Sequence, residues 1–297
     1  MFHEVEKKLI SLFLKKDWDE AYALLVQEEP NYPEKLHKFS FWKACLQCIL
    51  NQQEDAMKTL QNAFDRGFWW NPDLLKNDPD LSPLQDRKSF NALVRDCEKR
   101  KEEALKEAKP LVEFHGSQDP SAAIVVLHGR GGSMEDTIPY WMNEMSVRDY
   151  LFAFPQSSQT VGYNAYSWDD GERAQVEIKE VISKILKDYP DVKRILIAGF
   201  SQGGKTAIQL ALSGELDRTN EFYAVVPAIR EDDLHMKAAP GVSGWIIAGT
   251  EDPFWEDTME LKERLEKQRV VCRFMEFKEM AHTYPEQFSE LLQESLQ

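Results

Sequence analysis

The stretch from Arg194 to Leu212 constrains the fold of this 297-residue chain more than any other. It begins with an apolar run, residues 195–198, that is typical of a buried strand. It then passes through Gly-Phe-Ser-Gln-Gly (199–203) and continues as an amphipathic helix. A serine between a strand and a helix in a G-x-S-x-G turn is held in a strained conformation that displays its hydroxyl group. The flanking glycines fit because strand and helix pass close together there, and the helix N-terminus favours negative charge at Ser201. The competing interpretation is an ordinary glycine-rich turn.

From Leu111 onwards, short apolar runs alternate with amphipathic segments. We expect a hairpin of strands at 111–114 and 122–127, and then strands at 150–154, 195–198, 222–226, 245–248 and 270–277. Helices are expected at 174–188, 258–269 and 285–296. This alternation predicts an α/β fold with a mostly parallel sheet that is covered on both faces. Functional groups should then lie at the carboxyl ends of the strands.

Two more candidate residues follow predicted strands at those ends. Asp252 comes after the strand at 245–248, and His282 comes after the last strand. A serine hydroxyl becomes a useful nucleophile when an imidazole takes its proton, and a carboxylate fixes the imidazole tautomer. The chain order Ser, Asp, His is that of the α/β-hydrolases. Ser201, Asp252 and His282 are therefore the predicted catalytic triad, with Glu251 as the alternative acid.

A glycine-rich loop, residues 127–133, follows the strand at 122–127. Its flexibility would let the backbone N–H of Arg130 point at a developing oxyanion, and the N–H of Gln202 would be the second donor. We interpret His128 as a residue that orders this loop. A phosphate cradle at Gly131 and Gly132 is the alternative, but no Lys-Ser/Thr pair follows it.

The first third of the chain is predicted to be a separate helical domain, residues 1–110, followed by a catalytic domain at 111–297. Helix pairs over 4–29 and 34–66 superimpose at a spacing of 35 residues, which is close to the tetratricopeptide (TPR) period. Prolines break up residues 71–84, and a last helix runs towards Lys109. We therefore expect a TPR-like domain. Its concave face would suit a protein or peptide partner, and the alternative is a helical cap or a dimerisation element.

Two features of this helical domain have competing interpretations. Cys45 and Cys48 form a C-x-x-C motif, but the chain has no second such pair, so two residues on the inner face of a helix are favoured over a redox or metal site. Trp69 and Trp70 are interpreted as buried filler between repeats in preference to an exposed docking patch.

Charge excludes some classes of partner. The net charge is −15, with 18 basic and 21 acidic residues in 1–113 and 18 and 30 in the remainder. Binding to nucleic acid or to an anionic membrane is therefore not expected. Four cysteines without disulfide density indicate a reducing compartment. With no signal-peptide pattern and no apolar run of 18 residues, we expect a cytoplasmic protein.

Residues 111–297 resemble the phospholipase/carboxylesterase family of α/β-hydrolases, which includes the acyl-protein thioesterases. The matching segments are Leu-His-Gly-Arg-Gly-Gly (127–132), Phe-Pro-Gln (154–156), Ser-Trp-Asp (167–169), Gly-Phe-Ser-Gln-Gly-Gly (199–204), Gly-x-x-Asp-Pro (249–253) and His282. The resemblance implies a serine esterase that uses no metal and no cofactor, with Trp168 lining the acyl pocket. Arg130 and Ala248 depart from the family, since the thioesterases usually carry an apolar residue and a histidine there.

The expected function is hydrolysis of a small to medium carboxylic ester or thioester through an acyl-enzyme. Too few residues lie between Val226 and Trp245 for a large cap, so the site should be fairly open. One alternative is a serine peptidase that acts on peptides presented by the helical domain. The other is a partner-binding protein with a vestigial hydrolase domain.

Overall fold

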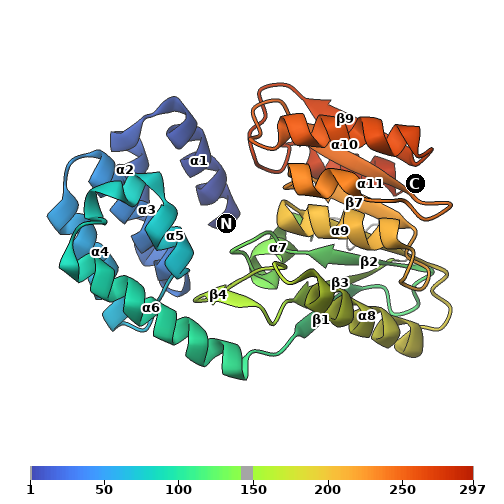
Figure 1. The fold of residues 1–297 in the computed structure, drawn as a ribbon, viewed down its shortest axis with the longest axis horizontal. Coiled ribbons are helices and arrows are strands. Elements are labelled where there is room, and N and C mark those ends of the chain that lie inside the picture. Colours follow the sequence, from blue (N-terminus) through green and yellow to red (C-terminus); the bar gives the residue numbers. More distant parts are fainter. Residues whose placement is uncertain (1, 142–149, 297) are drawn as a thin grey trace. The chain divides into compact units, whose positions relative to one another are not determined.

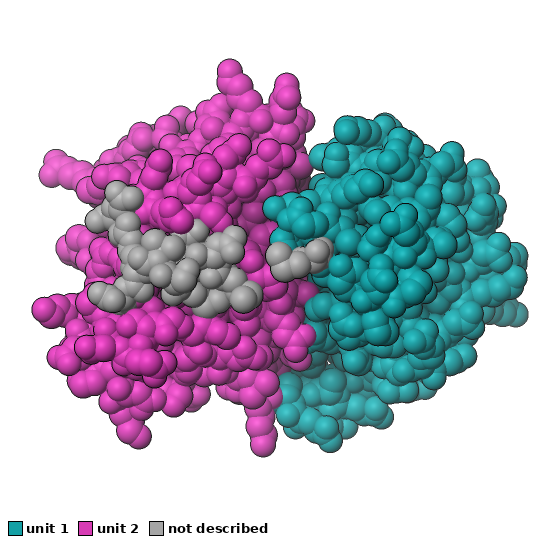
Figure 2. All heavy atoms as spheres, turned by 180° about the vertical axis from the view of Figure 1, so that it is seen from behind, with its two compact units in different colours: residues 1–108, 160–164 teal, residues 109–159, 165–297 magenta. Residues whose placement is uncertain are grey.

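The computed structural model describes residues 2–141 and 150–296. The chain divides into two compact units, which Figure 2 distinguishes by colour. The first unit comprises residues 1–108 together with 160–164, and the second comprises residues 109–159 and 165–297. Nothing in the sequence pattern indicated that the short segment 160–164 belongs with the helices of the first unit.

The first unit is built from helices that pack on their neighbours in the chain (Figure 1). Helix α1 packs on α2, α2 on α3, and α3 on α4. The predicted helical region is therefore confirmed, whereas its identity as a TPR array stays a prediction. The helices are α1 (Phe2–Lys15), α2 (Trp18–Glu28), α3 (Leu36–Ile49), α4 (Gln53–Asp65), α5 (Pro72–Asn77) and α6 (Lys88–Glu107), with 3₁₀ turns η1 (Glu29–Asn31), η2 (Pro33–Lys35) and η3 (Pro79–Leu84).

The core of the first unit contains the aromatic and sulfur side chains that the sequence left ambiguous. Trp69 and Trp70 are buried, and the Trp70 indole N–H donates to the backbone oxygen of His37 at 2.7 Å. Cys45 and Cys48 are buried on the inner face of α3. The predictions of a buried tryptophan pair and of two inward-facing cysteines are therefore confirmed.

The second unit contains a seven-stranded sheet in the order β1-β3-β2-β6-β7-β8-β9. Its neighbouring strands are parallel except for β1, which runs antiparallel to β3. This confirms the predicted mostly parallel sheet. The strands are β1 (Leu111–Gly116), β2 (Ala122–Leu127), β3 (Tyr150–Gln156), β6 (Arg194–Phe200), β7 (Glu221–Val225), β8 (Ser243–Gly249) and β9 (Val271–Phe277), and a separate pair is formed by β4 (Thr160–Gly162) and β5 (Ala165–Tyr166).

The predicted hairpin between the strands at 111–114 and 122–127 is wrong. β1 pairs with β3, and β2 lies between β3 and β6. The six residues of β2 are all buried, as a central strand requires, whereas β1 alternates between exposed and partly buried residues, as an edge strand does. The unbroken apolar run Ala-Ala-Ile-Val-Val-Leu indicates a strand that is buried on both faces. This burial places β2 inside the sheet, although β1 is its neighbour in the chain.

Helices cover both faces of the sheet (Figure 1). Because side chains alternate along a strand, Ile124 and Val126 pack into one apolar layer and Ala123 and Val125 into the other. The first layer is completed by α7 (Met134–Trp141) and α11 (Phe288–Ser295), and the opposite face is covered by α8 (Gly171–Asp188), α9 (Gln202–Ser213) and α10 (Trp255–Lys267).

The packing of α9 on the ends of β6 and β2 requires glycine at two positions and leaves little room for a side chain at a third. A Cβ atom at Gly199 would collide with the backbone of Gly203, and one at Gly203 would collide with the carbonyl oxygens of Leu127 and His128. A Cβ at Gly204 would approach the carbonyl oxygen of Gly199 to 3.0 Å. These obstacles are backbone atoms inside the sheet layer, so they have no room to move aside.

We predict that Gly203→Ala lowers the free energy of unfolding by about 2 kcal/mol or more, because overpacking against fixed backbone is among the larger single-residue costs. The matched control is Gly171→Ala at the start of α8, where an added Cβ meets no atom within 4 Å. Urea unfolding of both variants measures the difference. Equal stability of the two variants would contradict the tight crossing.

Candidate active site

Ser201 lies at the tip of the turn between β6 and α9, in a conformation that few residues adopt. Its φ is +55°, in the region that side chains disfavour. The turn is held by the end of β7 and the loop after it, because the Ser201 N–H donates to the Val225 oxygen at 2.9 Å and the Ala228 N–H donates to the Ser201 oxygen at 3.0 Å. Val226 also has a positive φ, of 38°. Two strained residues therefore lie side by side where the serine is displayed.

The loops that carry Asp252 and His282 are bonded to each other. The Thr250 N–H donates to the Phe277 oxygen at 3.0 Å, and the Glu251 N–H donates to the Met280 oxygen at 3.1 Å. The Glu279 N–H donates to the Thr250 hydroxyl at 2.9 Å. These bonds fix the end of β8 against the end of β9, so the acid and the imidazole are placed by one connected piece of backbone.

The three predicted triad residues meet at the carboxyl ends of β6, β8 and β9. His282 Nε2 lies 2.7 Å from Ser201 Oγ, and His282 Nδ1 lies 2.8 Å from Asp252 Oδ2. Asp252 Oδ1 accepts the Phe254 N–H at 2.8 Å, so both carboxylate oxygens have partners. Glu251, the alternative acid, is exposed. The geometry therefore joins Asp252 to His282.

The surroundings of His282 restrict how its ring can turn. The rings of Phe200 and Phe254 lie 5.2 Å and 5.4 Å from the imidazole. The Asp252 side chain is 3% exposed, whereas that of His282 is 27% exposed. The buried end of the arrangement is thus the carboxylate, and the end that solvent and small molecules can reach is the imidazole with the serine.

The two predicted oxyanion donors belong to different elements. Gln202 is the first residue of α9, so its N–H has no carbonyl partner one turn earlier in the helix. Arg130 lies in the loop after β2, which is fixed by two bonds to Tyr166. The Gly131 N–H donates to the Tyr166 oxygen at 2.7 Å, and the Tyr166 N–H donates to the Gly132 oxygen at 3.0 Å. The structure thus gives the glycine loop a defined partner strand.

Asp169 connects both of these residues through their side chains. Arg130 donates to it from Nε at 3.0 Å and from Nη2 at 2.9 Å, and Gln202 donates from Nε2 at 2.7 Å. Burial raises the pKa of the Asp169 carboxyl, but the bonds from Arg130 and Gln202 outweigh this and hold its pKa below the usual range. Sequence reasoning assigned no role to Asp169. The sequence signal that pointed to Asp169 was Arg130, because a cation in an acidic domain is expected to have a carboxylate partner.

Trp168 and His128 form a buried pair beneath the loop. The rings stack at 4.7 Å, and the Trp168 indole N–H donates to the His128 oxygen at 3.0 Å. Trp168 is 3% exposed, and its backbone N–H donates to the Gln202 side-chain oxygen at 2.9 Å. Trp168 thus supports the loop after β2 through its contacts with His128. The predicted contact of Trp168 with an acyl chain stays a prediction.

His128 is a neutral imidazole with both nitrogens in use. Nδ1 donates to the Gly129 oxygen at 2.9 Å, while Nε2 accepts from the Ser157 N–H at 3.4 Å and faces Gln156 Nε2 at 3.2 Å. Burial lowers the pKa of His128 to about 4. This residue orders the loop, as the sequence predicted.

We predict that His128 makes the protein less stable in mild acid. The unfolded chain takes up this proton as the pH falls below about 6.5, whereas the folded chain resists protonation down to about pH 4. The folded state keeps its full stability with respect to this group above pH 6.5. By pH 5, the preference of the unfolded chain for the proton should lower the free energy of unfolding by about 2 kcal/mol. The measurement is urea unfolding at pH 7.5 and 5 for the native protein and His128→Gln. A variant with an equally steep pH dependence would contradict this assignment.

Among the residues that the structure describes, one group has the composition and spacing to hold a metal ion. The ligand atoms of Cys45, Asp78 and Asp80 lie within 4.8 Å of one another in the first unit. Burial raises the pKa of the Cys45 thiol and of both carboxyls, so proton binding competes with any cation there.

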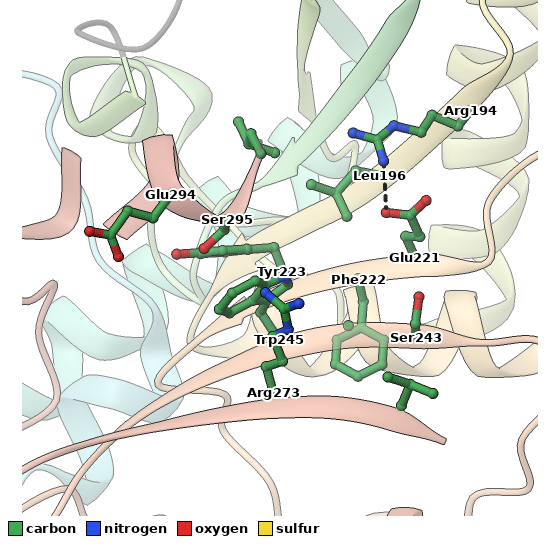
Figure 3. A pocket seen from close by; sticks show the side chains of 13 residues that line it. Arg194, Leu196, Glu221, Phe222, Tyr223, Ser243, Trp245, Arg273, Glu294 and Ser295 are labelled. Atoms are coloured by element: carbon green, nitrogen blue, oxygen red, sulfur yellow. Dashed lines mark ion pairs between the residues drawn. The ribbon is translucent and has the colours of Figure 1, made fainter. Parts of the chain in front are cut away.

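A pocket of about 260 Å³ lies at the amino ends of the strands, opposite the predicted triad (Figure 3). Arg194, Glu221 and Ser243, the first residues of β6, β7 and β8, line it, so it opens at the amino ends of the strands. Arg194 pairs with Glu221 at 3.5 Å, and the Arg273 guanidinium lies 4.7 Å from the centre of the Trp245 ring. The residues that line it include no histidine or cysteine. The candidate active site is therefore the carboxyl edge.

Within residues 2–141 and 150–296, no helix has both the length and the apolar character needed to cross a membrane.

Comparison with known families divides the chain in a similar way. Residues 2–105 match the family model of the A/B hydrolase-like N-terminal domain, and residues 148–294 match that of the dienelactone hydrolase family. A search of curated proteins gives no significant match.

Solved structures share the fold. An uncharacterised protein from Bacillus cereus is 25% identical, with a TM-score of 0.53, and the match covers 100% of this chain and 97% of that one. The esterase PE8 is 17% identical, with a TM-score of 0.54, over 63% of this chain and 98% of its own. A phospholipase/carboxylesterase from Dyadobacter fermentans is 19% identical, with a TM-score of 0.51, over 64% and 97%. The second unit therefore has the α/β-hydrolase fold, and residues 2–105 are similar to the A/B hydrolase-like N-terminal domain.

Proposed function

We propose that this protein is a serine hydrolase that cleaves carboxylic esters, with thioesters as a related substrate class. Ser201 would be the nucleophile, His282 the general base and Asp252 the residue that orients the imidazole. The observation that carries the proposal is that one imidazole bonds to both partners, at 2.7 Å to Ser201 Oγ and at 2.8 Å to Asp252 Oδ2. The match to a hydrolase family and the fold shared with esterases support the same class of reaction.

In the first half of the reaction, Ser201 Oγ attacks the ester carbonyl carbon while its proton moves to His282 Nε2. Asp252 accepts the Nδ1–H bond and stabilises the imidazolium that forms. His282 then gives the proton to the leaving alkoxide, which departs as an alcohol and leaves an acyl group on Ser201. In the second half, water attacks this acyl-enzyme by the same proton route. The acid is released and the serine is restored.

The oxyanion that forms at each tetrahedral stage needs donors that are already in place. We assign this role to the backbone N–H groups of Gln202 and Arg130. Gln202 begins α9, so the partial positive charge of the helix N-terminus adds to its own N–H. The side chains of both residues donate to Asp169, so one carboxylate holds the two proposed donor residues.

The proposed substrate is small to medium in size. The segment between β7 and β8 contains only one short helical turn, η5 (Glu231–His235), and the His282 side chain keeps 27% of its surface exposed. Both observations support an open site, where a long acyl chain would find little apolar wall to bury it. We further propose that the helical unit binds a protein or peptide partner, which would give the same triad a second class of substrate.

We predict that Ser201→Ala loses about 10⁵-fold or more in kcat towards p-nitrophenyl butyrate, since removal of the nucleophile from a triad removes nearly all of its chemistry. The matched control is Ser213→Ala at the exposed end of the same helix, which should keep native activity. The measurement is release of p-nitrophenol by the three proteins at pH 7.5.

Two other results would redirect the proposal. Faster cleavage of aminoacyl p-nitroanilides than of esters would make the protein a serine peptidase. If no ester or anilide is cleaved, and protein partners are captured equally by the native chain and by Ser201→Ala, the hydrolase domain is vestigial.

We also predict that kcat/KM across p-nitrophenyl esters from C2 to C12 is highest for short or medium chains. Each buried methylene contributes about 0.8 kcal/mol, or about fourfold in kcat/KM, so a long apolar channel would give a steep rise with length. The series must be measured below the critical micelle concentration of the longest ester. A continued rise through C12 would contradict the open site.

A further inference from the structure

A short arm of the hydrolase sequence belongs to the helical unit. Residues 160–164, which include β4 and the turn after it, cluster with the helices, while the flanking residues 159 and 165 belong to the sheet unit. Thr160 and Val161 are each 6% exposed, and β4 packs against α6. The chain thus leaves the second unit for five residues and then returns to it.

Tyr163 is the side chain that fixes the tip of this arm. Its ring lies edge-on to Phe68 at 4.7 Å and 5.3 Å from the ring of His37. Its backbone N–H donates to the Trp69 oxygen at 3.0 Å. Asn164 follows with a φ of 46°, so the chain reverses tightly after the ring. An aromatic contact and a backbone bond therefore hold the same residue.

The base of the arm is fixed within the second unit. The Ser167 N–H donates to the Gln159 oxygen at 3.0 Å, and the Gln159 side chain bonds Asp170 in both directions, at 2.8 and 3.0 Å. The arm is thus a short loop whose two ends are clamped together. We therefore expect that a displacement of Tyr163 at the tip also displaces the base at Gln159 and Ser167, because few residues lie between them.

The residues that return from the arm are those that hold the proposed oxyanion loop. Tyr166, three positions after Tyr163, exchanges backbone bonds with Gly131 and Gly132 at 2.7 and 3.0 Å. Asp169, three further on, binds the Arg130 guanidinium and the Gln202 amide. One short run of chain therefore reaches from the aromatic contact in the helical unit to the neighbours of both proposed donors.

We propose that Tyr163 is a positioning residue for ester hydrolysis, and that through it the helical unit sets the geometry of the oxyanion loop. The inference rests on the proposed function for its effect on catalysis. With the ring in its contact, Tyr166 is held against the glycine loop and the Arg130 N–H is aligned. With the ring removed, the return strand loosens, and the loop after β2 loses part of its support.

The test compares Tyr163→Ala and Phe68→Ala with the native protein, because each variant removes one side of the same contact. Loss of a whole oxyanion donor costs about 100- to 1,000-fold in kcat, so a loosened donor should cost about tenfold, with KM changed by about twofold or less. The double variant should lose no more than either single one. Tyr163→Phe keeps the ring and should retain native kcat.

Two further measurements separate positioning from general damage. Phe13→Ala, a control in the first unit whose ring packs on Trp18 at 5.4 Å, should keep native kcat. Amide hydrogen exchange of the peptide over 128–133 should be faster in Tyr163→Ala and Phe68→Ala, and unchanged in Phe13→Ala. This second readout requires no catalytic activity.

The outcomes are distinct. Unchanged exchange over 128–133 in Tyr163→Ala overturns the inference, and so does an equal loss in Phe13→Ala. Native kcat in Tyr163→Ala, when the native protein cleaves esters, overturns the role in catalysis. If the native protein cleaves no ester, the proposed function fails on its own, and hydrogen exchange alone decides whether the arm holds the loop.

Discussion

The close approach of β6 and α9 is the constraint on which the second unit depends. Backbone of α9 meets backbone of β6 at Gly199, Gly203 also packs on the end of β2, and the turn between β6 and α9 holds Ser201 at a φ of +55°. A turn of this kind is costly, and it persists because β2 is fully buried on one side of β6 and β7 is buried beyond its first residue on the other. The bonds from Ser201 to the loop after β7 add a local hold. The stability of the sheet thus maintains the strain that displays the serine.

The polar groups around that turn form one continuous network. Asp169 gathers donors from Arg130 and Gln202, and the neighbouring Trp168 is stacked on His128. Gln202, Trp168 and His128 are buried and would be costly without partners, whereas Arg130 and Asp169 are exposed and close the network at the surface. The side chains of Arg130, Gln202 and Trp168 thus hold backbone segments in place around the serine.

Much of this architecture could be predicted because its signals are local. A strand, a G-x-S-x-G turn and a helix specify the position of Ser201, and the fold then brings Asp252 and His282 to the same edge. The pairing of β1 could not be read in the same way, because it depends on which strand is buried on both faces. The roles of Asp169 and Tyr163 also escaped prediction. Each acts through a contact distant in sequence, and neither belongs to a periodic pattern that would mark it.

The arm at 160–164 also bears on how such a protein could be divided or recombined. The chain passes from helices to sheet at 108/109, which suggests two exchangeable modules, yet five residues of the later sequence are packed with the earlier one. A chain cut at that point would keep β5 beside β4 but would lose the packing of β4 against α6, so the buried Thr160 and Val161 would become exposed to water. Any replacement of the helical part would have to supply contacts in place of those that α6 and Phe68 make with the arm. The two units are therefore expected to be inherited as a pair.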